Sequence, residues 1–180
     1  GLNAVTQLNK DALKDAAPDL PVILVGGHVA SLPERTLAEE RCDFVADGEG
    51  LYTLVDLLDA LASGTSPDLS KVRSLWRREG KGARCTDVSA PLVQDLDHEM
   101  PGIAWDLLPM QLYRAHNWHC FGEPSRMPYV SLYTTLGCPY KCSFCCIQAP
   151  FKSGEAAAGY KASVNSYRMW STARVLDDLT

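Results

Sequence analysis

In Thr135-Leu136-Gly137-Cys138-Pro139-Tyr140-Lys141-Cys142-Ser143-Phe144-Cys145-Cys146, four cysteines fall within nine residues. Three of them have the spacing C-x3-C-x2-C, namely Cys138, Cys142 and Cys145. Three thiolates on one short loop can hold three irons of a 4Fe–4S cluster and leave the fourth iron without a protein ligand. An iron with an open position can bind a substrate, whereas a fully ligated cluster only carries electrons. The spacing therefore predicts a cluster loop that takes part in chemistry.

The flanks of the cysteines support a loop that follows a strand. Residues 128–135 alternate and are rich in β-branched and aromatic side chains, which predicts a strand that leads directly into the loop. Gly137 and Pro139 predict a tight turn around the first cysteine. Downstream, residues 152–166 show no stable pattern, and we expect a mobile loop there. Residues 171–179 have a helical pattern.

A structural zinc site is the alternative, with Cys146, Cys120, His116 or His119 as the fourth ligand. Structural zinc sites usually use two cysteine or cysteine–histidine pairs well apart in sequence, and the sequence has no second pair. Disulfides are disfavoured because seven cysteines are an odd number. Free thiols in this number fit a reducing cytoplasm. We interpret Cys146 as a small buried neighbour of the loop or as a competing ligand.

The composition limits the class of protein. With 180 residues, 46% of them hydrophobic and 22% charged, the chain is typical of a soluble globular protein. It has no run of 18 apolar residues, so we expect no membrane span. The net charge of −5 argues against a nucleic-acid partner. The sequence starts without methionine and enters and leaves inside helical patterns, so we expect it to be part of a longer protein.

The first third of the chain alternates helices and strands. Helical patterns at residues 2–17, from Ser31 onward and at 51–62 enclose short apolar runs at 21–25 and 43–46. A short continuous apolar run is typical of a strand buried on both faces of a parallel sheet. The order predicts half of a doubly wound α/β domain.

Composition changes after Ser63, which suggests three parts. Residues 1–63 form the α/β half-domain, 64–127 an interdomain connector, and 128–180 the part that contains the cysteine loop. Within the connector, residues 71–78 and 82–88 predict a hairpin. We interpret His98, like His116 and His119, as a surface or hydrogen-bonded structural group.

Glycine-rich turns follow both predicted strands of the half-domain. Gly26, Gly27 and His28 follow the first, and Gly48, Glu49 and Gly50 follow the second. Ligands of parallel sheets bind outside the carboxyl ends of the strands, and a glycine there lets a large ligand approach the backbone. The alternative is that these glycines only form strand-to-helix turns. A GxGxxG fingerprint is absent, so a dinucleotide site is not supported.

Together, these segments resemble the cobalamin-dependent radical S-adenosylmethionine (SAM) family. Residues 22–28 and 43–50 are similar to the second half of its cobalamin-binding domain, and residues 135–145 to its cluster loop. The similarity extends to the connector at Asp95-Leu96-Asp97 and Met100-Pro101, and to Tyr167-Arg168-Met169-Trp170-Ser171. The resemblance implies that a partial TIM-like barrel begins with the strand, the cluster loop and the first helix at residues 128–180.

The resemblance also implies cofactors, partners and residue roles. It assigns Cys138, Cys142 and Cys145 to a 4Fe–4S cluster, Phe144 to the adenine of SAM, and Gly26, Gly27, His28, Gly48, Glu49 and Gly50 to cobalamin. It implies a cytoplasmic enzyme that uses a 5′-deoxyadenosyl radical to methylate an unactivated carbon or phosphorus of a small molecule. An electron donor such as flavodoxin or ferredoxin would serve it. The alternative is a non-catalytic module that binds cobalamin, or zinc or an iron–sulfur cluster.

Overall fold

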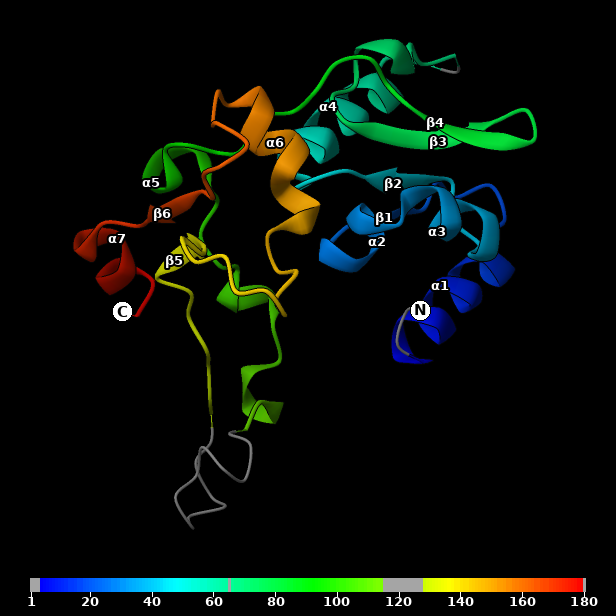
Figure 1. Ribbon diagram of the computed structural model, residues 1–180. Helices are drawn as coiled ribbons and strands as arrows, with labels where there is room; N and C mark the ends of the chain where they lie inside the picture. The colour runs from blue at the N-terminus through cyan, green and yellow to red at the C-terminus, as the bar shows by residue number, and fades with distance from the viewer. Residues whose placement is uncertain (1–3, 65, 115–127, 180) are drawn as a thin grey trace. The chain divides into compact units, whose positions relative to one another are not determined.

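The computed structural model describes residues 4–64, 66–114 and 128–179. These residues form two compact units (Figure 1). The first lies within residues 1–92 and 137–166, and the second within residues 93–136 and 167–180. The hairpin segment and the cysteine loop thus both belong to the first unit, while the division into 1–63, 64–127 and 128–180 stays a prediction.

The first unit is built on a mixed sheet with the order β1-β2-β3-β4. The chain runs through α1 (Ala4–Ala16), β1 (Ile23–Leu24), α2 (Gly27–Ser31), α3 (Pro33–Glu39), β2 (Phe44–Ala46) and α4 (Leu51–Ala62). β1 and β2 are parallel, which confirms the predicted α/β order. After η1 (Leu69–Lys71), the hairpin of β3 (Leu75–Glu79) and β4 (Gly82–Cys85) continues the sheet with antiparallel pairing.

The sheet buries apolar side chains on both faces. Val45 of β2 packs with Val29 and Leu37 of the α2–α3 segment on one face. Its neighbour Phe44 packs with Leu57 of α4 and with residues of β3 on the other face. Successive side chains of a strand point to opposite faces, so a strand between two helical layers is apolar throughout. This is why the short runs in the sequence lack alternation.

The second unit joins the predicted connector to the end of the chain. It holds α5 (Leu96–Glu99), η2 (Trp105–Leu107), η3 (Met110–Leu112), most of β5 (Thr135–Gly137), β6 (Tyr167–Met169) and α7 (Thr172–Asp177). β5 and β6 form a two-stranded sheet. The backbone N–H of Ser171 donates to Asp97 Oδ1 at 2.9 Å, and Trp105 Nε1 donates to the carbonyl of Asp178 at 3.1 Å. Two segments that resemble the same family therefore contact each other.

Two local predictions are wrong. The predicted strand at residues 128–135 is reduced to β5, which starts at Thr135. β6, which pairs with it, has three residues, and side chains before β5 such as Tyr133 (80% exposed) lie in solvent. The predicted mobile loop at 152–166 begins instead with α6 (Lys152–Ala157), which buries Gly154 and Glu155 and directly follows η5 (Ala149–Phe151).

In the part of the chain that the structure describes, no helix combines the length and the apolar character that crossing a bilayer requires.

Candidate functional site

The cysteine loop follows β5 within the first unit. Gly137 has a φ of 89°, a left-handed conformation that side chains other than glycine rarely adopt. The backbone N–H of Cys145 donates to the carbonyl of Cys142 at 3.0 Å, which closes a tight turn between the second and third cysteines. The N–H of Ala149 donates to the carbonyl of Cys146 at 2.9 Å. Short turns thus keep all four cysteines on one loop.

The thiols of this loop are accessible. Cys138 is half-buried, and Cys142, Cys145 and Cys146 are exposed and free. The predicted buried position of Cys146 is therefore wrong. Over residues 4–64, 66–114 and 128–179, no three His, Cys, Asp or Glu side chains are arranged to hold a metal ion. The structure places the three predicted ligands on one loop without bringing their sulfur atoms together.

The donor set nevertheless fits the predicted group. Three accessible thiols at this spacing are the ligands of a 4Fe–4S cluster with one open iron. Zinc would need a fourth ligand. Cys146 is on the same loop, whereas Cys120, His116 and His119 lie outside the described residues. His98 is exposed, and its ring Nδ1 lies 2.8 Å from Asp95 Oδ2, as expected for a surface or hydrogen-bonded group.

Phe144 lies between the second and third cysteines of the loop and is 90% exposed. It does not pack beneath the loop as a core residue. Its assignment to the adenine of SAM stays a prediction.

A pocket of about 380 Å³ lies beside the loop. Its lining combines two cysteines with amine and amide side chains, and comprises Tyr140, Lys141, Cys145, Cys146, Ile147, Gln148, Ala149, Lys152 and Asn165. The pocket therefore offers hydrogen-bond donors and positive charge next to the third predicted cluster ligand.

The second set of predicted residues lies at the carboxyl ends of β1 and β2. Gly26, Gly48 and Gly50 have φ values of 115°, 69° and 79°, so each turn requires glycine. Gly27 and His28 begin α2, where His28 is exposed. Glu49 is half-buried. The structure brings these six residues to one edge of the sheet, as parallel strands require.

Part of this edge faces the segment that follows the cysteine loop. A Cβ atom at Gly27 would lie 3.4 Å from Pro150 Cγ, and one at Gly48 would lie 4.0 Å from Ser153 Oγ. A Cβ atom at Gly26, in contrast, would meet nothing within 4 Å. The backbone beside Gly26 is therefore open, whereas Gly27 and Gly48 allow the chain itself to approach.

The sequence assigns no role to Asp47, yet this residue connects the turn after β2 with α6. Burial raises the pKa of its carboxyl group, while hydrogen bonds from Ser153 and from the N–H of Gly48 act to lower it. Asp47 stands beside Gly48 in the sequence, but its contact with Ser153 depends on the folding of α6. No pattern in the neighbouring sequence predicts that contact.

Comparisons with known proteins support one class. No protein-family model matches the chain. The chain is 34% identical over 152 residues to the uncharacterized methyltransferase PH0819 of Pyrococcus horikoshii, a match that covers 81% of this chain and 30% of that protein. It is 33% identical over 175 residues to the hopanoid C-3 methylase of Methylococcus capsulatus, which covers 94% of this chain and 28% of that protein. The chain thus spans less than a third of both relatives.

The fold is similar to that of a solved enzyme. The radical SAM methyltransferase TsrM of Kitasatospora setae, with cobalamin and a 4Fe–4S cluster bound, superposes with a TM-score of 0.57 at 19% identity, over 95% of this chain and 30% of that one. Its complex with tryptophan and a SAM analogue gives a TM-score of 0.55 at 19% identity, over 95% of this chain and 29% of that one. The chain therefore shares the fold of this enzyme over the matched residues, in line with the resemblance that the cysteine and glycine motifs indicate. The homologues of the chain are methyltransferases.

Proposed function

We propose that this chain is part of a cobalamin-dependent radical SAM methyltransferase that methylates an unactivated carbon or phosphorus of a small molecule. The observation that carries the proposal is the placement of Cys138, Cys142 and Cys145 as accessible, free thiols on one loop. The methyltransferase relatives support the same reaction class.

The residues of the chain would divide the work between two places. The three cysteine thiolates would hold the cluster, and the pocket beside the loop would receive the polar part of SAM. Lys141 and Asn165 line that pocket with polar groups, whereas the amine of Lys152 already donates to Glu155, Asn165 and the carbonyl of Val164. The edge of the sheet at Gly26 would hold cobalamin. When bound, the cluster would supply the electron that cleaves SAM, and cobalamin would supply a carrier for the methyl group. Flavodoxin or ferredoxin would deliver the electron.

The test uses the full-length protein that contains this chain. After anaerobic reconstitution, it is incubated with SAM, hydroxocobalamin and a reductant, and the consumption of SAM is followed by chromatography. We expect consumption in the wild type and none in the triple variant Cys138→Ala, Cys142→Ala, Cys145→Ala. Cys85→Ser, in β4, is the matched control and should retain activity. Equal consumption in the wild type and the triple variant would overturn the proposal.

One variant separates the proposal from the zinc-binding alternative. Cys146→Ala leaves the three predicted cluster ligands intact. An enzyme with a three-cysteine cluster keeps its iron and its SAM consumption in this variant. A four-thiolate zinc site would instead contain one zinc in the wild type and lose it on this substitution.

A further inference from the structure

A buried carboxylate lies on α6, in a segment whose sequence predicts no regular structure. Glu155 of α6 is 2% exposed. Its Oε2 lies 2.6 Å from Lys152 Nζ, and its Oε1 accepts the backbone N–H of Ser166 at 2.7 Å. Burial acts to raise the pKa of Glu155 and is the largest influence, but the hydrogen bonds from Lys152 and Ser166 lower it overall. A buried charge persists only where such partners compensate its desolvation.

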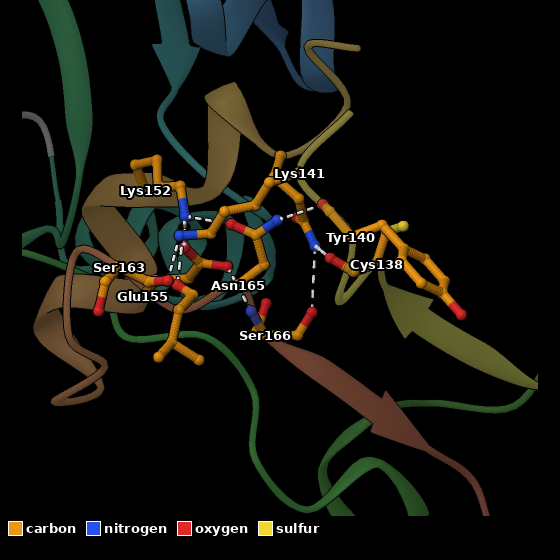
Figure 2. Close-up of polar contacts among 10 residues, drawn as sticks. Cys138, Tyr140, Lys141, Lys152, Glu155, Ser163, Asn165 and Ser166 are labelled. Carbon is orange, nitrogen blue, oxygen red and sulfur yellow. Dashed lines mark hydrogen bonds and ion pairs between the residues drawn. The ribbon is translucent and has the colours of Figure 1, made fainter. Parts of the chain in front are cut away.

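One chain of hydrogen bonds runs from this carboxylate to the cysteine loop (Figure 2). Lys152 Nζ donates to Asn165 Oδ1 at 2.7 Å. Asn165 Nδ2 in turn donates to the carbonyl of Tyr140 at 2.8 Å. Tyr140 stands between the first two predicted cluster ligands, so Glu155 reaches the backbone of the cluster loop through two side chains.

A second route passes through Ser166. Gln148 Nε2 donates to the carbonyl of Ser166 at 3.1 Å and to the carbonyl of Cys138 at 3.2 Å. Both partners are acceptors, so the amide of Gln148 must present its NH2 group to them. Lys141 Nζ also donates to the carbonyl of Ser163. Residues 163–166 thus lie against the turn at residues 137–141, and Glu155 fixes their end.

From this geometry we infer that Glu155 is a positioning residue for the cluster: through Ser166 and Asn165 it holds the backbone around Cys138 and Tyr140 in one conformation, from which the thiols would take up the cluster. The inference rests on the proposed function of the loop. Backbone carbonyls that are already hydrogen-bonded cannot reorient freely, so the backbone that carries the first cysteine keeps its position in the loop. Outer groups of this kind orient metal ligands and tune the metal.

The experiment compares Glu155→Ala, Glu155→Gln and Asn165→Ala in the reconstituted full-length protein. The readouts are the electron paramagnetic resonance spectrum of the reduced cluster and the rate at which a chelator removes iron. We expect Glu155→Ala to alter the spectrum and to accelerate iron loss about tenfold, in line with other outer-shell substitutions. Glu155→Gln retains an acceptor for the N–H of Ser166. Its spectrum and its rate of iron loss should therefore lie between those of the wild type and of Glu155→Ala. Asn165→Ala should alter the spectrum while leaving the Glu155–Lys152 pair intact.

Control variants separate positioning from general stability. Glu39→Ala removes the partner of Arg35 on α3, an exposed pair, and should leave both readouts unchanged. If Glu155→Ala does not fold, as judged by circular dichroism, Asn165→Ala alone decides. Spectra and iron-loss rates equal to those of the wild type in the folded variants would overturn this inference and leave the proposed function intact. A wild type that binds no iron would overturn the proposed function itself.

Discussion

A methyl group on the α-carbon of Gly137 would lie 2.2 Å from the carbonyl oxygen of Ser166, closer than any van der Waals contact allows. The residue before the first cluster cysteine therefore touches the backbone of the segment that Glu155 holds. This contact joins the cysteine loop to residues 152–166, for which the sequence pattern predicts no regular structure.

We expect Gly137→Ala to destabilise the turn at Cys138 because it adds a steric overlap to backbone strain. Gly159 also has a positive φ, of 84°, but a Cβ atom there would meet nothing within 4 Å. Gly159→Ala should thus cost only the strain of a left-handed alanine, about 1–2 kcal/mol. Urea denaturation measures both variants. If Gly137→Ala lowers the free energy of unfolding no more than Gly159→Ala does, the Ser166 carbonyl can move away from the added methyl group at little cost.

A second prediction concerns Asp56 and Arg73, which join α4 to the segment that precedes β3. The Asp56 carboxylate accepts Arg73 Nε at 2.7 Å, Nη2 at 2.8 Å and the backbone N–H at 3.1 Å. Both side chains are mostly shielded from solvent. Asp56→Asn should lower the free energy of unfolding by about 1–2 kcal/mol at neutral pH. Glu39→Ala, at the exposed pair, should cost less than about 0.5 kcal/mol.

The same pair gives a pH dependence. The hydrogen bond from Arg73 lowers the pKa of Asp56 below its usual 3.8. The stability that the ionised carboxylate supplies is complete above the unfolded value and is lost as the pH falls through the lowered folded value. The gap between wild type and Asp56→Asn should stay constant from pH 7 to about 5 and shrink below about 4. A gap that widens on acidification would contradict the assignment.

Asp47 should behave in the opposite way. Burial raises its pKa above 3.8, so ionisation costs stability as the pH rises through the folded value. Asp47→Asn keeps an acceptor for Ser153 and should be at least as stable as the wild type at pH 7, with the advantage vanishing below about pH 4. Chemical denaturation at the two pH values checks this. If Asp47→Asn is less stable than the wild type at pH 7 but not at the lower pH, the charge of Asp47 itself stabilises this edge of the sheet.

The glycine edge allows a matched pair of substitutions in the full-length protein. A Cβ atom at Gly27 has ordinary contact with Pro150, so Gly27→Ala should be accommodated. Gly27→Val adds bulk toward Pro150 and the ligand edge, and it should weaken hydroxocobalamin binding in an absorbance titration. Because Pro150 follows the cysteine loop, the iron content should be measured in parallel. Unchanged cobalamin affinity in folded Gly27→Val would mean that Gly27 does not border the cobalamin site.

What the sequence reveals depends on how local the determining contacts are. The helix at 51–62 and the strand at 44–46 follow from apolar patterns within a few residues, and the structure confirms both. The cysteine loop is also local, since its spacing alone defines the donor set. The hairpin was predicted, but its place in the sheet depends on pairing with β2, which no turn signal encodes.

The two incorrect predictions of local structure share the opposite cause, because the contacts that decide them are distant in sequence. Residues 152–157 form a helix whose Gly154 lies against Leu92 and whose Glu155 bonds Ser166. A pattern with many alanines and glycines shows neither partner. Likewise, the β-branched run before Thr135 has strand propensity, but a strand also needs a neighbouring strand to pair with.

The measurement that tests the central claim most directly is the metal content of the full-length protein after anaerobic reconstitution with iron and sulfide. The account predicts about four irons per chain in a reducible cluster, and none in the variant with Cys138, Cys142 and Cys145 all replaced by alanine. A cluster that survives this triple replacement, or one equivalent of tetrahedral zinc in the wild type, would contradict it.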